Sequence, residues 1–300
     1  MSDQASELRD ASLREERRPA PPPLRLRCLA VGSGKGGVGK TMISIGLACC
    51  LARMKYRVLL MDADLGLANV DLQMGINPIF TLQDIVYGSC TPEEAVVSVP
   101  DGPDVLAAAS GAPELADMGS ARRQMLVEEL MRFASRYDYL VIDVGAGIGA
   151  GVTSFLAAAP EVLVVVANEP TSIMDAYSLI KVLRQATDPP SISLMINMVR
   201  SLEEGELLAQ RINVITKKFL STELPVAGIV MYDTLVGDSI RARQPLIHYA
   251  GQSAPAKCLD ETARSIISGP AKGRAGKPAG FDFFDKLTDT GPHAQEVPAS

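Results

Sequence analysis

The chain alternates between short runs dominated by apolar residues and longer segments in which apolar residues recur at helical spacing. Apolar runs with few polar interruptions predict strands that are buried on both faces. These runs lie at residues 26–31, 57–61, 104–108, 139–142, 162–166, 193–196 and 226–230. The helical patterns lie between and after them, at residues 42–53, 122–135, 171–186, 203–221 and 255–267. This alternation predicts an α/β fold with a mostly parallel central sheet and helices on both faces.

Changes in composition mark the limits of this domain. Residues 1–18 are polar and favour a helix, and residues 19–24 form a proline-rich, extended linker. The alternating pattern fills residues 25–268, which predicts one domain with flexible termini. The tail, residues 269–300, is rich in Gly, Pro, Ala and Lys, a composition typical of disorder, but it contains an apolar island at 280–288.

This island, with its phenylalanines and Leu287, could form an amphipathic motif that binds a membrane or a partner. Asp282 and Asp285 lie beside the apolar residues, whereas membrane-binding helices normally carry basic residues there. Membrane insertion, docking onto a protein and simple disorder therefore remain open for this motif.

Composition and charge exclude several classes of protein. The net charge of −6 makes DNA an unlikely partner, because binding to nucleic acid relies on a basic surface. None of the five cysteines forms a C-x-x-C pair, which argues against an iron–sulfur or zinc site and fits a reducing compartment. No apolar run is long enough to cross a bilayer, and the N-terminus lacks a hydrophobic signal segment. These features predict a cytoplasmic protein.

The most specific motif lies at residues 33–41, which read Ser-Gly-Lys-Gly-Gly-Val-Gly-Lys-Thr. It fits the phosphate-loop pattern G-x-x-x-x-G-K-S/T between a predicted strand and a predicted helix. In such a loop the backbone N–H groups surround phosphate oxygens, the lysine reaches the β- and γ-phosphates, and the hydroxyl binds Mg²⁺. The expected ligands are therefore ATP or ADP with Mg²⁺. The predicted nucleotide-binding residues of the loop are Gly34, Lys35, Gly36, Gly37, Val38, Gly39, Lys40, Thr41 and Met42.

Polar residues follow several of the predicted strands, where ligands of parallel α/β sheets bind. Asp143 and Asp62 are candidates, with Thr41, for binding Mg²⁺, partly through water. Asp64 is the candidate for orienting or deprotonating the attacking water. Asn197 and Asp233 are candidates for contacts with the adenine or the ribose. Helix capping, turn formation or loop contacts would explain the same residues without a ligand.

Lys35 is a second lysine in a loop whose phosphate-binding cation is already Lys40. Two nucleotide sites that face each other would repel strongly, and a lysine reaching across from each subunit would offset that repulsion. The alternative is an exposed lysine without such a task.

The loop from Lys35 to Thr41 resembles the deviant Walker A motif of the MinD/ParA ATPases, in which the extra lysine is the signature residue. The stretches 62–71, 143–148 and 169–177 are most similar to the flagellar-number regulators of the FlhG (FleN) branch. The resemblance covers about residues 25–250 and implies a P-loop NTPase of the MinD-like SIMIBI type. It further implies an ATP-dependent homodimer with Lys35 crossing between subunits. Catalytic roles then fall to Lys35, Lys40, Asp64 and Asp143, and the dimer attaches reversibly to the inner face of the cell membrane.

Residues 3–9, Asp-Gln-Ala-Ser-Glu-Leu-Arg, are similar to the element with which that branch stimulates the FlhF-type signal-recognition GTPase. The implied partner-activating residues are Asp3, Gln4, Leu8 and Arg9, with Gln4 at the partner's GTP site. A flagellar transcription regulator or a switch-complex protein is a further implied partner. A MinD-like regulator of the division site and a ParA-like DNA- or cargo-partitioning ATPase are the alternatives.

Overall fold

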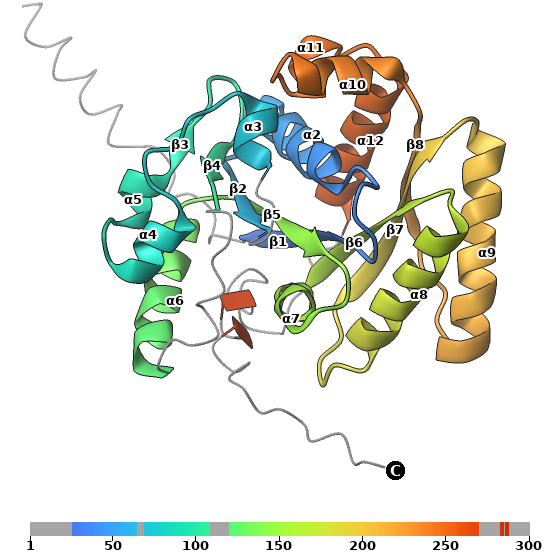
Figure 1. Ribbon diagram of the computed structural model, residues 1–300, viewed down its shortest axis with the longest axis horizontal. Coiled ribbons are helices and arrows are strands. Elements are labelled where there is room, and N and C mark those ends of the chain that lie inside the picture. Colours follow the sequence, from blue (N-terminus) through green and yellow to red (C-terminus); the bar gives the residue numbers. More distant parts are fainter. Residues whose placement is uncertain (1–25, 65–68, 109–119, 270–282, 285, 288–300) are drawn as a thin grey trace, which may run out of the picture.

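The computed structural model describes residues 26–64, 69–108, 120–269, 283–284 and 286–287 (Figure 1). The predicted helix at 1–18, the linker at 19–24 and most of the tail lie outside the described residues.

Eight strands form one sheet. They are β1 (Arg27–Ser33), β2 (Val58–Ala63), β3 (Val97–Ser98), β4 (Asp104–Leu106), β5 (Tyr139–Ala146), β6 (Glu161–Ala167), β7 (Ser191–Val199) and β8 (Val226–Met231). Their order across the sheet is β3-β4-β2-β5-β1-β6-β7-β8. All neighbours are parallel except β3, which pairs antiparallel with β4 at one edge. The mostly parallel sheet is therefore confirmed; β3 was not predicted because two residues are too few to produce a pattern.

The helices connect these strands. They are α2 (Lys40–Arg53), α3 (Val70–Met74), α4 (Leu82–Tyr87), α5 (Pro92–Ala95), α6 (Ser120–Ala134), α7 (Ala150–Ala158), α8 (Pro170–Arg184), α9 (Leu202–Leu220), α10 (Thr234–Arg241), α11 (Leu246–Tyr249) and α12 (Ala254–Ser268). The five predicted helices correspond to α2, α6, α8, α9 and α12. The others have four to nine residues, too few to show a clear helical period.

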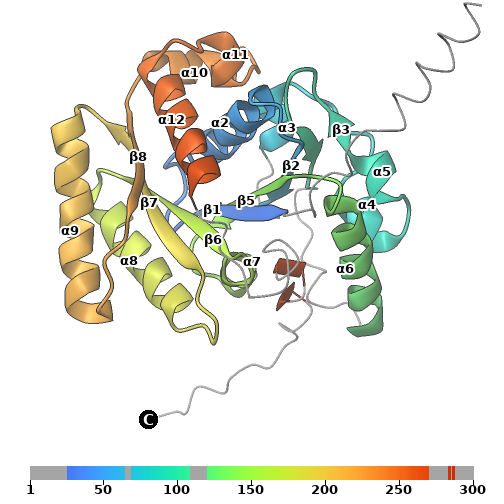
Figure 2. The ribbon, with the colours of Figure 1, turned by 180° about the vertical axis from the view of Figure 1, so that it is seen from behind.

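Helices cover both faces of the sheet, so each inner strand contributes to two cores. In β6, Val162, Val164 and Val166 pack in one core while the residues between them pack in the other. The first core lies under α7, α8 and α9, and the second lies under α2 and α12 (Figures 1 and 2). The apolar runs of the sequence thus reflect burial on both faces.

Part of the tail's apolar island packs into the first core. Phe283 is fully buried and Phe284 is 2% exposed. The Phe283 ring lies 6.4 Å from the ring of Phe155 on α7. The short tail segments, coloured dark red, lie beside α7 in both views (Figures 1 and 2). Lys286 Nζ forms an ion pair with Asp188 Oδ2 at 2.9 Å. These phenylalanines therefore do not present an exposed apolar face.

Among the helices in the described part of the chain, none has the length and apolar character needed to cross a membrane.

Candidate nucleotide-binding site

Two of the candidate acidic residues lie within the carboxyl-terminal halves of neighbouring strands. Asp62 is in β2 and Asp143 is in β5, which continues to Ala146, and the two aspartates are directly paired in register. Asn197 lies in β7, which continues to Val199. The predicted strand ends were therefore too early, because a polar side chain does not interrupt backbone pairing with the neighbouring strand. The consequence is that the two carboxylates lie side by side in a buried layer.

The phosphate loop joins β1 to α2, with Gly39 as the N-cap and Lys40 as the first helical residue. Gly39 has φ +84°, a conformation that side chains rarely adopt. At Gly34, a Cβ atom would lie 2.3 Å from the Asp175 carbonyl oxygen, so only glycine fits against α8. The loop therefore brings the N-terminus of α2, with its free N–H groups, to the carboxyl-terminal edge of the sheet.

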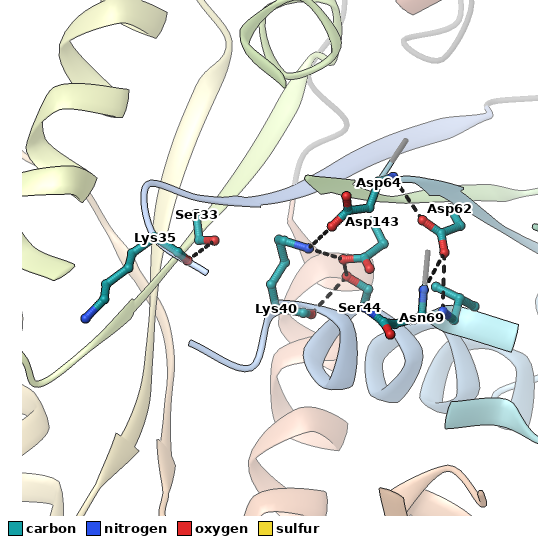
Figure 3. A network of polar contacts seen from close by, with 9 residues as sticks. Ser33, Lys35, Lys40, Ser44, Asp62, Asp64, Asn69 and Asp143 are labelled. Carbon is teal, nitrogen blue, oxygen red and sulfur yellow. Dashed lines mark hydrogen bonds and ion pairs between the residues drawn. The ribbon is translucent and has the colours of Figure 1, made fainter. Parts of the chain in front are cut away.

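Lys40 is 7% exposed and lies between two carboxylates (Figure 3). Its Nζ is 3.3 Å from Asp143 Oδ1 and 3.8 Å from Asp64 Oδ2. The Ser44 hydroxyl also donates to Asp143 Oδ1, at 2.9 Å. Ser44 was not predicted, although it lies four residues after Lys40 and hence on the same face of α2. These contacts fix the position of the Lys40 ammonium group beside two carboxylates.

Asp143 is almost fully buried, and its Oδ2 atom has no hydrogen-bond partner among the described residues. Burial raises the pKa of the Asp143 carboxyl, although Lys40 and the hydroxyls of Thr41 and Ser44 act against this shift. A buried, unpaired carboxylate oxygen beside the Thr41 hydroxyl fits the hard oxygen ligands of Mg²⁺. No group of three His, Cys, Asp or Glu side chains that could hold a metal occurs in the described residues. Mg²⁺ commonly takes one or two carboxylates and completes its shell with phosphate and water.

Asp62 is buried, and its carboxylate accepts three backbone hydrogen bonds. Oδ1 accepts from Asp64 N at 2.9 Å, and Oδ2 accepts from Asn69 N and Val70 N, both at 3.2 Å. Burial, and secondly the charge of Asp143, raise the pKa of Asp62 to about 7, against the effect of these three bonds. Asp62 therefore anchors the chain on both sides of residues 65–68, a task that the sequence spacing did not reveal.

Lys35 points away from Lys40 (Figure 3). Its Nζ donates to the Glu169 carboxylate and, at 3.0 Å, to Thr171 Oγ1 at the start of α8. Neither Glu169 nor Thr171 was predicted as a site residue, because they are more than 130 positions away in the sequence. Lys35 is thus held at the surface, apart from the carboxylates that surround Lys40.

The two candidates for contacts with the base or the ribose both bind backbone atoms. Asn197 Nδ2 donates to the Val38 carbonyl oxygen at 2.8 Å, so Asn197 contacts the phosphate loop directly. Asp233 is the N-cap of α10, and its Oδ1 accepts from Leu235 N at 2.9 Å. Asp233 therefore has the capping task that the sequence had left as an alternative.

A phosphate loop at the start of α2, opposite carboxylates on neighbouring parallel strands, defines a P-loop NTPase. Residues 26–196 match the family model described as an AAA domain. The chain belongs to the MinD/ParA family of ATPases, as its loop with the second lysine had indicated.

Two bacterial flagellar proteins are among its relatives. The chain is 37% identical over 245 residues to the antiactivator FleN of Pseudomonas aeruginosa, covering 82% of this chain and 88% of FleN. It is 32% identical over 243 residues to the flagellum site-determining protein YlxH of Helicobacter pylori, covering 80% and 81% of the two chains. A chain of the MinC:MinD cell division protein complex of Aquifex aeolicus has the same fold, with a TM-score of 0.66 and 25% identity, over 81% of this chain and 96% of that one.

Proposed function

We propose that this protein is an ATP-hydrolysing dimerisation switch that regulates the number and placement of flagella. The single observation that carries the dimerisation step is the direction of Lys35. This lysine is held at the surface by Glu169 and Thr171, where its ammonium group can be offered to a second molecule. The similarity to FleN and YlxH supports the flagellar role.

Within one protomer, the described side chains suit hydrolysis of ATP. Lys40 would exchange its carboxylate partners for the β- and γ-phosphates, while the loop N–H groups bind the remaining phosphate oxygens. Asp64 Oδ2 lies 3.8 Å from Lys40 Nζ, a distance that supports a role for this carboxylate in orienting water beside the γ-phosphate. Thr41 and the free Oδ2 of Asp143 would hold Mg²⁺, the latter through water. When bound, Mg²⁺ would neutralise negative charge on the phosphates.

In the proposed dimer, each Lys35 leaves Glu169 and binds the triphosphate of the other protomer. The Lys35–Glu169 pair is partly exposed, with 36% and 57% of the two side chains accessible. Exposed pairs of this kind contribute only up to about 1 kcal/mol, so a triphosphate can replace the carboxylate at small cost. Hydrolysis followed by release of inorganic phosphate removes negative charge from the site that holds Lys35 across the interface, and thereby favours dissociation.

The oligomeric state with ADP and with a non-hydrolysable ATP analogue tests this proposal. By light scattering after size exclusion, we expect monomers with ADP and dimers with the analogue. Lys35→Ala should stay monomeric in both, and its hydrolysis should fall by at least about tenfold because transition-state charge is no longer stabilised.

Lys181→Ala, a change at an exposed lysine of α8, is the matched control and should behave as wild type. Asp64→Ala should dimerise with ATP itself, because it binds nucleotide but hydrolyses slowly. If Lys35→Ala dimerises and hydrolyses ATP like wild type, Lys35 does not act across a dimer interface and each protomer hydrolyses ATP without a residue from the other.

We further propose that residues 1–18 stimulate an FlhF-type GTPase through Gln4, with Asp3, Leu8 and Arg9 forming the docking contacts. A peptide of residues 1–18 should accelerate GTP hydrolysis by that partner, measured as phosphate release. The Gln4→Ala peptide should lose at least about tenfold of the stimulation, since a glutamine that positions water acts in the transition state. A Ser12→Ala peptide is the control. Equal stimulation by all three peptides would exclude Gln4 from the mechanism.

The relatives' names suggest the other partners. An antiactivator acts against an activator, so the similarity to FleN supports a flagellar transcription regulator as a partner. The name of YlxH supports a role at the site of flagellar assembly, where the membrane surface and a switch-complex protein would be available. Phe283 and Phe284 are buried in the core, so they could contact lipid only after leaving it.

A further inference from the structure

Asn197 in β7 contacts the phosphate loop that follows β1. It is 2% exposed, and its Nδ2 donates to the Val38 carbonyl oxygen at 2.8 Å, across a sequence separation of 159 residues. A Cβ atom added to Gly39 would lie 2.3 Å from the same Nδ2. The amide group therefore fills the space directly behind the Val38–Gly39 peptide.

The hydrogen-bonding capacity of the partner atom fixes the orientation of this amide. The Val38 carbonyl oxygen can only accept a hydrogen bond, so the amide nitrogen of Asn197, and not its oxygen, must face it. In a planar trans peptide, the carbonyl group and the following N–H point in opposite directions. By holding the Val38 carbonyl, Asn197 turns the Gly39 N–H the other way, toward the position of the bound phosphates.

An irregularity in β7 aims Asn197 at the loop. Ile196 pairs with Ile229 and Val199 pairs with Met231, so β7 carries one residue more than β8 over this stretch. The extra residue forms a β-bulge, a feature that redirects side chains near functional sites. Met198 lies in this bulge with φ +59°, a conformation disfavoured for residues other than glycine.

Met198 is 40% exposed, and its Cε atom would lie 3.3 Å from a Cβ atom added to Gly39, so the Met198 side chain also lies beside the phosphate loop. Backbone strain is retained where the surrounding structure requires it, most often at functional sites. Here the strained residue directly follows the buried Asn197 that holds the phosphate loop.

We propose that Asn197 is a positioning residue for the phosphate loop, and that the strained bulge at Met198 is the device that aims it. This inference rests on the nucleotide-binding part of the proposed function and adds the residue that sets the loop's geometry. It assigns to Asn197 an effect on phosphate affinity that is independent of the base. A residue that only read adenine would instead affect ligands that carry adenine.

The test compares ATP with tripolyphosphate, which has no base, as competitors of a fluorescent ATP analogue. Asn197→Ala should weaken both ligands by about threefold to tenfold, as expected for one lost buried hydrogen bond, and should leave their ratio unchanged. Weaker ATP with unchanged tripolyphosphate would overturn the proposal in favour of a base reader. Wild-type protein that bound neither ligand would instead overturn the proposed function.

A second pair of variants changes Met198 and tests whether the positive φ at the bulge positions Asn197, which itself is left unchanged. Met198→Gly keeps the positive φ without strain and should bind both ligands more tightly than Met198→Val, because glycine adopts positive φ freely. Met198→Val should bind both ligands as weakly as Asn197→Ala, because a β-branched residue resists positive φ. Thermal melts and circular dichroism of each variant are the control for whether the fold is kept. If the glycine and valine variants both bind like wild type, the bulge does not aim Asn197 and the proposal fails.

Discussion

We expect Lys40→Met to lose about a thousandfold in affinity for ATP, because removing one partner of a buried charge pair costs about 2–5 kcal/mol or more. The buried Lys40 Nζ lies 3.3 Å from Asp143 Oδ1 in β5. Methionine keeps much of the side-chain volume, so the loss reflects charge and not packing. Isothermal titration calorimetry with ATP is the measurement, and Lys181→Met is the control. Retained ATP binding by Lys40→Met would mean that the phosphates bind elsewhere.

The same variant has a second expected effect, on stability. Without Lys40, the buried Asp143 loses the largest of the influences that oppose the rise in its pKa. An acid whose pKa is higher in the folded than in the unfolded protein binds more protons when folded, so stability falls as pH rises above the unfolded value of about 4. Asp62, with its pKa raised to about 7, acts in the same direction between about pH 4 and 7. Thermal melts at pH 5 and 7 should therefore differ more for Lys40→Met than for wild type.

The sequence was sufficient for the fold because its signals are local. A central strand such as β6 is apolar at every inner position, so it is recognisable without knowing its neighbours. The phosphate loop is equally local, since its glycines, Lys40 and Thr41 lie within eight consecutive residues. The proximity of Asp62 and Asp143 also follows, once both are placed toward the carboxyl ends of two neighbouring parallel strands.

The remaining contacts of the site could not be predicted, because tertiary structure selects them. Glu169 meets Lys35 across 134 positions, and Asn197 meets Val38 across 159. Many surface carboxylates could have paired with Lys35, and nothing in the spacing distinguishes Glu169 from them. The bulge at Met198 is also invisible in the sequence, where a methionine gives no sign of positive φ.

We expect Phe283→Ala to lower the free energy of unfolding by about 3–5 kcal/mol, the usual cost of truncating a fully buried phenylalanine. Phe283 has no exposed surface, and its ring lies 5.0 Å from that of Phe284 and 6.4 Å from that of Phe155 on α7. The alanine would leave a cavity between α7 and the tail. The measurement is urea unfolding followed by circular dichroism, with Phe219→Ala as the control.

Phe219 is 62% exposed on α9, so its truncation should cost no more than about 1 kcal/mol. A chain ending at Gly269 lacks Phe283 and Phe284, the two buried phenylalanines of the tail. It should be destabilised at least as much as Phe283→Ala. If Phe283→Ala costs no more than Phe219→Ala, the tail is not part of the core in solution, and its apolar side chains are available to a membrane or a partner. The comparison therefore decides between a packed segment and an exposed motif, a choice that composition alone had left open because Asp282 and Asp285 flank the phenylalanines.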